Sequence, residues 1–332
     1  MPRLFQSCAF AAPVICAFIT GCSAREDQSM LDTDSGDVDY QLSMTTEILL
    51  TSEAGDKIAT KENVSFRVGD PSGTTVVVHP AIVKQTIVGI GSSFTESSAF
   101  ELAHLEPEAR AKVMDRIYSE QGANFSLTRT PIGSTDFSVE GKYSYASVEH
   151  DRSLEHFSIA PDIDGFLATE YPGIKDEKFD LLPMIKQAMA IKNAQEDSEL
   201  RIVASAWTAP PWMKDIEDWY LPGTPENNYQ GTGGTLKPEY VQTYADYVVL
   251  YLDAYRDEVV DIWGLTPVNE PHGNRGNWES MHFTPETQNE FIKQNLGPAL
   301  RAGEFGDVKL LIYDQNRDDL EHWADEIFGD PE

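Results

Sequence analysis

The feature that most constrains the fold is a regular alternation of apolar strand-like runs and amphipathic helical stretches, which begins near residue 85. The pattern predicts five strands, at 85–91, 123–133, 200–208, 260–270 and 307–314. It predicts helices at 106–121, 181–195, 238–259, 284–303 and 318–329. Strands that alternate with helices of this length indicate parallel βα units.

Two α/β folds are built from such units, the doubly wound sheet and the (β/α)8 TIM barrel. A dinucleotide-binding sheet would need a glycine-rich phosphate loop, but "GIGSSF" lacks the third glycine and the acidic ribose partner that follows it. We therefore predict the TIM barrel. A closed barrel needs eight units, so the barrel in this chain is expected to be incomplete and the chain to be a fragment. Its open strand edge predicts that the chain alone folds poorly and is inactive.

The first 22 residues have the pattern of an export signal. Arg3 precedes an apolar run at 10–22 that is too short to remain as a membrane helix. The run ends in Ile-Thr-Gly-Cys, which resembles the lipobox of bacterial lipoproteins and implies lipidation of Cys22. The alternative is an ordinary signal that is cleaved near Ala24. The chain is thus expected to be exported and held in the bacterial cell envelope by a lipid anchor.

The segments that follow predict a tether and a small β region. Residues 23–41 are polar and acidic, which is typical of a flexible tether. Residues 42–81 contain the β-prone runs "TEILLT", "VSFRV" and "TTVVVHP", which predict antiparallel strands, and residues 82–332 form the predicted partial barrel. All three cysteines lie within residues 1–22, so the mature chain is expected to hold no disulfide and no thiolate metal site.

The charge balance limits the partners. The chain has 25 basic and 55 acidic residues, a formal net charge of -30. Such a surface repels nucleic acid and anionic lipid, so neither is expected as a main partner, and membrane contact is expected only through the lipid anchor. The acidic excess itself is most simply a solvated surface.

Active sites of TIM barrels lie at the C-terminal ends of the strands. Polar and aromatic residues lie in the C-terminal half of the predicted strands or just after them: Glu96, Arg129, Asp136, Trp207, Trp212, Asn269, Glu270, Asp314 and Gln315. Aromatic faces stack on sugar rings, and carboxylates and amides pair with sugar hydroxyls, so this set suits a carbohydrate site. Structural alternatives remain open: Arg129 can neutralise a carboxylate, Trp207 can be a core residue, and Glu96 can stabilise a helix N-terminus.

Two other kinds of site are not supported by the sequence. His272 and His282 have no third ligand at a metal-binding spacing, so no metal site is predicted. The chain has no Gly-x-Ser-x-Gly elbow, which argues against an α/β-hydrolase. No cofactor is expected.

Five motifs occur in order along the chain: "VGIGSSFTESSAFEL", "LTRTPIGSTDFS", "VASAWTAPPWMK", "TPVNEP" and "FTPETQNEFIKQNLGPAL". Together they resemble glycoside hydrolase family 30, the glucosylceramidase-like retaining β-glycosidases, from about Leu42 to the last residue. The resemblance implies a TIM barrel with an attached β-sandwich, to which residues 42–81 would contribute. It also implies a β-glucoside substrate, such as a β-1,6-glucan or a glucosylceramide-like glycolipid.

The resemblance further implies a role for each matching residue. Glu270 would be the general acid/base. Asn269 would bond the sugar 2-hydroxyl, and Trp207 would line the sugar subsite. Glu96 would bind sugar hydroxyls and Arg129 would support the catalytic carboxylates. Two departures are "GIGSS" in place of the family's "GFGGA" and Glu96 in place of the usual Asp, which put the shape of the site near the first strand and the preferred sugar in doubt.

The second carboxyl group of the mechanism lies outside the sequence. Retaining hydrolysis uses two carboxyl groups about 5–5.5 Å apart. In the family the nucleophile is a Glu at the end of the seventh strand, so it is expected beyond residue 332. A hypothesis from another class is a catalytically inactive carbohydrate-binding surface lipoprotein, which would keep Trp207, Trp212 and Asn269 as a sugar platform.

Overall fold

The computed structural model describes residues 45–65, 72–228, 230–273 and 276–331. The chain divides into two compact units, residues 1–84 and 85–332, and each is described by itself. The predicted signal peptide, the lipidation at Cys22 and the tether lie outside the described residues. Within the described ranges, no helix is long and apolar enough to span a membrane.

The first unit contains a β-hairpin. Strand β1 (Thr45–Leu50) pairs antiparallel with β2 (Ala59–Ser65), and the register shifts between Thr46 and Ile48. The run 74–80, predicted as a further strand, is not assigned as a strand, and Val76 is 82% exposed. That prediction was wrong because a β-branched run becomes a strand only where a neighbouring strand completes its ladder. The described part of this unit is a hairpin, and the predicted β-sandwich stays a prediction.

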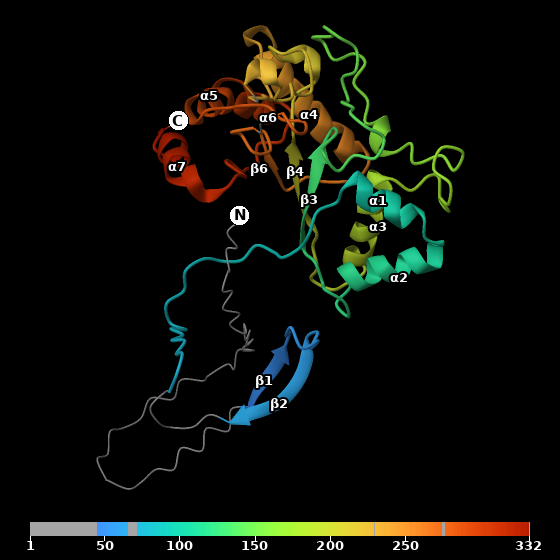
Figure 1. Cartoon of the computed structure of the whole chain (residues 1–332), viewed down its shortest axis with the longest axis vertical. Coiled ribbons are helices and arrows are strands. Elements are labelled where there is room, and N and C mark those ends of the chain that lie inside the picture. The colour runs from blue at the N-terminus through green and yellow to red at the C-terminus, as the bar shows by residue number, and fades with distance from the viewer. Residues whose placement is uncertain (1–44, 66–71, 229, 274–275, 332) are drawn as a thin grey trace, which may run out of the picture. The chain divides into compact units, whose positions relative to one another are not determined.

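The second unit is built on a parallel sheet, as the alternation predicts. Its order is β3 (Leu127–Ile132), β4 (Arg201–Ala206), β5 (Gly264–Thr266) and β6 (Lys309–Leu310) (Figure 1). The register pairs Thr128 with Ile202 and Ser205 with Thr266. Because all four strands are parallel, their C-terminal ends share one edge of the sheet.

The first predicted strand, 85–91, is not a regular strand but runs beside β3. The Ile90 carbonyl accepts from Ser126 N at 2.9 Å, Ser92 O accepts from Arg129 N at 3.1 Å, and Ser93 forms a parallel bridge with Arg129. A Cβ on Gly91 would lie 1.4 Å from the Leu127 carbonyl oxygen, so only glycine permits this approach. Ile87 and Ile90 are exposed, since no described strand covers the other edge of this segment.

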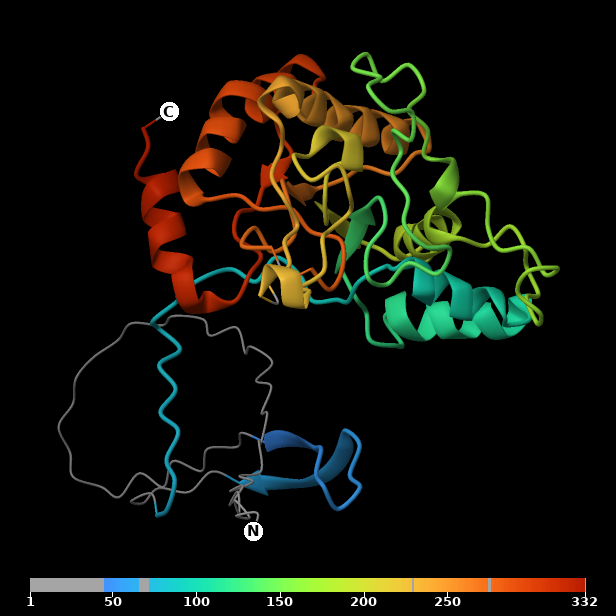
Figure 2. The same cartoon turned by 45° about the horizontal axis from the view of Figure 1, so that its top comes forward.

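Helices pack along the sheet in groups. The views in Figures 1 and 2 show α1 (Glu96–Ala103), α2 (Pro107–Tyr118) and α3 (Leu181–Asn193) gathered beside β3. α4 (Val241–Asp257) lies beside β3 and β4, and Glu258 at its C-terminal end pairs with Lys186 of α3. Beside β6 lie α5 (Pro285–Phe291), α6 (Gly297–Ala302) and α7 (Leu320–Phe328). Short 3-10 turns occupy Ala160–Asp162, Pro211–Met213, Pro225–Asn227, Pro238–Tyr240 and Arg317–Asp319.

The helix predicted at 284–303 is interrupted. A π-helical turn, Ile292–Leu296, separates α5 from α6. Pro298 follows directly and has no backbone N–H to continue the α-helical ladder, which accounts for the wider turn.

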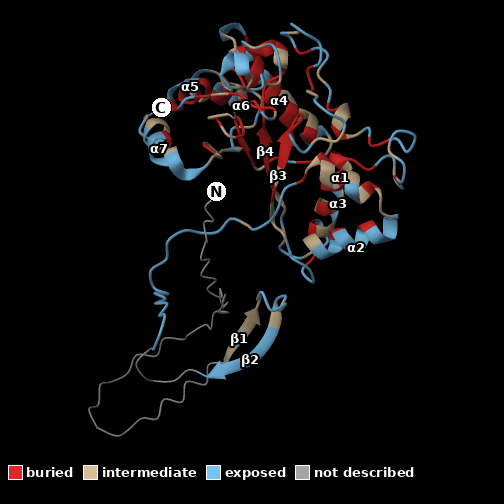
Figure 3. Ribbon diagram, in the orientation of Figure 1, coloured by how far each residue is buried: buried red, intermediate tan, exposed pale blue. Residues whose placement is uncertain are grey.

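The core lies between the sheet and its helices, and Figure 3 shows β3 and β4 largely buried. Tyr247 and Tyr251 of α4 stack on Tyr145 with ring centroids 6.0 and 5.8 Å away. Within this aromatic layer, Asp162 accepts hydrogen bonds of 2.6 Å from the hydroxyls of both Tyr145 and Tyr255. Burial raises the pKa of Asp162 to about 7. The layer fixes the long loop after β3, which contributes to the C-terminal edge of the sheet.

Candidate active site

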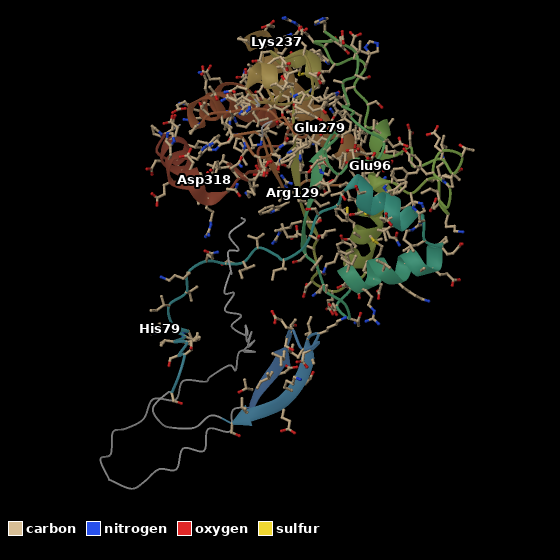
Figure 4. The ribbon with its side chains drawn as sticks, viewed as in Figure 1. His79, Glu96, Arg129, Lys237, Glu279 and Asp318 are labelled. Atoms are coloured by element: carbon tan, nitrogen blue, oxygen red, sulfur yellow. The ribbon has the colours of Figure 1, made fainter. Side chains whose placement is uncertain are left out.

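Arg129 joins the ends of four strands at the C-terminal edge of the sheet. Its Nη2 donates to Ser205 Oγ at 2.8 Å, to Asn269 Oδ1 at 2.6 Å and to Asp314 Oδ2 at 2.7 Å. These residues come from β3, β4 and the segments that follow β5 and β6. In the view of Figure 4, Arg129 lies between Glu96 on the α1 side and Asp318 on the α7 side. The Arg129 Nη2 has two hydrogens and lies within hydrogen-bond distance of three acceptors, so the polar groups are packed tightly around it.

Asp314 is the most heavily bonded carboxylate of this network. Besides Arg129, it accepts from Ser205 Oγ at 3.2 Å, from Thr266 Oγ1 at 3.3 Å and from the backbone N–H of Glu270 at 3.3 Å. Burial raises its pKa, and the Arg129 guanidinium opposes that rise. Asp314 therefore ties the chain after β6 to the turn after β5.

Glu270 begins a tight turn four residues after Thr266, the last residue of β5. Its backbone lies in the left-handed region, with φ at +47°, and its carbonyl accepts from Gly273 N at 2.6 Å. Such a conformation is strained for a residue with a Cβ and is often found at functional sites. Asn269, just before it, donates its backbone N–H to the Ala206 carbonyl at 2.6 Å, so the turn is fixed against the end of β4.

The surroundings of Glu270 raise the pKa of its carboxyl group. Burial raises the pKa of its carboxyl, the nearby charges of Asp314 and Asp136 raise it further, and Arg129 partly offsets them. A carboxyl group with a raised pKa is suited to donate a proton near neutral pH. This is the environment that an acid/base catalyst needs.

Trp207 forms a wall beside this network. Its indole Nε1–H donates to Asp136 Oδ1 at 3.1 Å, and the Arg129 Cζ lies 4.5 Å from its ring centroid. The ring and Arg129 also line a cavity of about 590 Å³, together with Ser93 and Phe137. An aromatic ring held at the edge of such a cavity can stack on an apolar sugar face.

Glu96 is placed differently from the other predicted site residues. It is 3% exposed in the first turn of α1, and its Oε2 accepts from the backbone N–H groups of Val139 and Glu140. Burial raises its pKa to about 7. In the part of the chain that the structure describes, its hydrogen bonds go to this loop and not to Arg129, Asn269 or Glu270. Glu96 does lie in the first turn of α1, as its structural alternative expected, but its hydrogen bonds go to the loop at 139–140. The carboxylate beside Trp207 is that of Asp136.

Trp212 and Gln315 also follow predicted strands. Trp212 is 5% exposed, donates its indole N–H to the Ala146 carbonyl at 2.9 Å and packs edge-on against Tyr240. It lines a second cavity of about 600 Å³ formed by the loops after β3 and β4. Gln315 accepts from the backbone N–H of His272 at 3.4 Å.

Two residues of the network were not predicted from the sequence. Ser205 and Thr266 lie inside strands and bond to each other, to Asp314 and, through Ser205, to Arg129. The sequence feature that could have identified Ser205 and Thr266 is a hydroxyl residue within an otherwise apolar strand. As for metals, the residues that the structure describes contain no group of three or more His, Cys, Asp or Glu arranged to hold an ion.

Comparison with known proteins gives a consistent result. Residues 87–332 match the Glycosyl hydrolase family 30 TIM-barrel domain. The lysosomal acid glucosylceramidase of Mus musculus is 31% identical over 268 residues, which cover 79% of this chain and 46% of that protein. The endo-1,6-beta-D-glucanase of Neurospora crassa is 30% identical over 241 residues, covering 72% of this chain and 44% of that protein.

A solved structure agrees with the sequence relatives. The endo-beta1,6-glucanase BT3312 superposes with a TM-score of 0.60 at 28% sequence identity, covering 76% of this chain and 50% of that one. The chain therefore spans about half the length of the relatives it matches. The TIM-barrel prediction is confirmed for the matched residues.

Proposed function

Because the chain belongs to glycosyl hydrolase family 30, we propose that it is the N-terminal portion of a retaining β-glycosidase that hydrolyses β-glucosides. The observation that carries this proposal is the Arg129 network, which holds Asn269, Glu270 and Asp314 together at the C-terminal edge of the sheet.

In the proposed double displacement, Glu270 acts twice. It first donates its proton to the glycosidic oxygen as the leaving group departs, and a nucleophilic carboxylate forms a bond to the anomeric carbon. Glu270, now ionised, then removes a proton from water, which attacks the same carbon and releases the carboxylate. The raised pKa of Glu270 supports the first role. A purely sugar-binding protein would gain nothing from a proton donor of this kind, which favours the enzyme over a binding lipoprotein.

The nucleophile is proposed to come from sequence beyond residue 332. The support is that the relatives are about twice as long as the matched region. Asp314 is a poor substitute because Arg129, Ser205, Thr266 and the Glu270 backbone already occupy its oxygens. Its role in this proposal is to fix the turn of Glu270.

The other site residues would bind and orient the sugar. Asn269 would bond the 2-hydroxyl, Trp207 would stack on the ring, and Arg129 would hold the carboxylates in place. Glu96 remains a proposed ligand for sugar hydroxyls, although its carboxylate is engaged by the loop at Val139 and Glu140.

The walls of the second cavity support a glucan over a glycolipid as substrate, whereas the cavity beside Trp207 also has apolar walls that include Phe94, Ile117 and Phe137. The wall of the second cavity carries half-buried Trp219 among polar side chains that include Lys142, His150 and Glu217. Aromatic faces interleaved with polar groups suit sugar residues, whereas the acyl chains of a ceramide need continuous apolar surface. The relatives are described as glucosylceramidase and as endo-1,6-glucanase, so both substrate classes belong in the test.

The direct test uses the full-length protein with a β-1,6-linked gluco-oligosaccharide, glucosylceramide in detergent micelles, and an aryl β-glucoside. The expected result is hydrolysis of the aryl glucoside and faster turnover of the oligosaccharide than of the lipid, with the β-anomer as the first product by proton NMR. An α-anomer as first product, or no hydrolysis of any β-glycoside, would refute the proposed reaction. Faster turnover of the lipid would refute only the substrate preference.

We also propose that the protein is exported and anchored at Cys22 in the bacterial cell envelope. This rests on the lipobox-like end of the apolar run at residues 10–22.

A further inference from the structure

An aromatic cluster made of His272, Tyr313 and Trp323 lies beside the turn at residues 269–273. The His272 ring packs edge-on against Tyr313, with centroids 5.4 Å apart, and lies 5.8 Å from Trp323. Tyr313 and Trp323 stack on each other at 5.1 Å. His272 is two residues after Glu270 and Tyr313 is one residue before Asp314, so the cluster contacts both chain segments that carry the carboxyl groups.

A single nitrogen of His272 faces two partners of opposite character. Its Nε2 lies 3.1 Å from the indole Nε1 of Trp323 and 3.4 Å from Asp319 Oδ2. An indole N–H can only donate, so this contact requires an unprotonated Nε2 with a free lone pair. A carboxylate can only accept, so the contact with Asp319 requires a protonated Nε2. The two bonds cannot exist at the same time.

We propose that His272 is a positioning residue for Glu270, and that protonation of its imidazole transfers its hydrogen bond from Trp323 to Asp319. This inference rests on the proposed role of Glu270 as the acid/base. Neutral His272 anchors the turn 269–273 to Trp323, which is 0% exposed on α7. The protonated ring turns toward Asp319, and the buried indole N–H loses its acceptor.

The strain in the two segments explains why this anchor matters. Glu270 and Tyr313 both have left-handed backbone conformations, with φ at +47° and +53°. Residues with a Cβ hold such conformations only when their surroundings fix them. His272 and Trp323 supply that restraint from behind the turn, because they join it to a buried position of α7.

Other charged groups surround the His272 ring, where the hydrogen bond is proposed to move from Trp323 to Asp319. Asp319 also faces His322 Nδ1 at 3.5 Å, and His322 Nε2 faces Glu286 of α5 at 3.8 Å. Asp318 accepts from the Tyr313 hydroxyl at 3.3 Å. His282 lies beside Gly273, and burial lowers its pKa, so it adds little positive charge near neutral pH. Acidic groups therefore dominate on the α7 side of the His272 ring.

The test compares two substitutions in the full-length protein. His272→Gln offers an amide oxygen that can accept from Trp323 but does not titrate, whereas His272→Leu removes the acceptor. The expected result is that His272→Leu lowers kcat by roughly tenfold or more at neutral pH with little change in KM, because the acid/base is misplaced. His272→Gln should keep kcat at neutral pH and lose less activity than the wild type on acidification, because its amide does not titrate.

The matched control is His79→Gln, which changes an exposed histidine of the other unit and should leave the profile unchanged. Wild-type kcat in His272→Leu, or an unchanged acidic limb in His272→Gln, would overturn the proposal.

A second readout separates this inference from the proposed reaction. Indole emission from Trp323 should fall as His272 becomes protonated, and this change should be absent in His272→Gln and in Trp323→Phe. An emission titration without glycosidase activity would sink the proposed function and leave the transfer standing. No difference in emission titration between the wild type and either variant would refute the transfer itself.

Discussion

Replacing Arg129 with methionine removes the cation that four strand ends share while keeping a side chain of similar length. The Arg129 and Asp314 side chains are 30% and 24% exposed. Breaking a fully buried ion pair costs about 3–5 kcal/mol, and partial exposure lets water replace part of the interaction, so we expect a loss of about 2 kcal/mol. For a domain of about 250 residues that corresponds to a fall in Tm of about 4–8 °C, and the longer full-length protein should show a smaller fall.

The loss should depend on pH in a defined direction. Burial already raises the pKa of Asp314 and Arg129 opposes the rise, so the methionine variant has a still higher pKa at Asp314. The ionised carboxylate needs the guanidinium, whereas the protonated carboxyl does not. The difference in stability between wild type and variant should therefore be largest near neutral pH and shrink as acidification protonates Asp314.

The assay is thermal unfolding of the full-length protein at neutral and acidic pH. Arg129→Lys keeps the positive charge on a side chain that is one bond shorter. Its Tm should lie between those of the wild type and Arg129→Met. Arg116→Met, on the exposed face of α2, controls for the loss of any arginine. An unchanged Tm at neutral pH, or a difference that grows on acidification, would refute the proposed role of Arg129.

Three further predictions concern other parts of the molecule. Trp207→Phe keeps an aromatic ring but removes the N–H that donates to Asp136. The value of kcat/KM on an aryl β-glucoside should fall roughly fivefold, which corresponds to the loss of one hydrogen bond. Unchanged kinetics would argue against a sugar subsite at Trp207. Protonated Asp162 stabilises the wild type below its unfolded pKa of 3.8, and this stabilisation should be lost as the pH rises through its folded pKa of about 7. Asp162→Asn stays neutral, so its free energy of unfolding in urea should lack this decline. The same pH dependence in wild type and variant would contradict the raised pKa. Cys22→Ser should move the protein from the membrane fraction to the soluble fraction of cells, and retention in the membrane fraction would exclude the lipid anchor.

The sequence predicted those features that depend on local pattern. The runs at 123–133, 200–208 and 260–270 became strands because each pairs in parallel with its neighbour and its apolar residues, such as Ile132, Ile202 and Leu265, are buried. The runs 74–80 and 85–91 have similar composition, but neither is assigned as a strand, and 85–91 has only a partial ladder beside β3. Whether a β-prone run becomes a strand depends on its neighbours, which a single run does not encode.

The site shows the same division. The rule that active sites lie after barrel strands identified Arg129, Asn269, Glu270 and Asp314, and the structure brings these four together. That Ser205 and Thr266 complete the network depends on the register of β4 and β5, which pairs them directly. The placement of Glu96 depends on the loop at 139–140 folding back onto α1, a long-range contact that its position after the first strand could not reveal.

The most direct test of the central claim is the dependence of Glu270→Gln on the leaving group, measured in the full-length protein with Glu120→Gln as an exposed control. On a poor leaving group that needs a proton, kcat/KM should fall by about 10²–10⁴. On a dinitrophenyl glucoside, whose leaving group needs none, kcat/KM should change far less. Equal losses on both substrates, or none on either, would contradict the assignment of Glu270 as the acid/base.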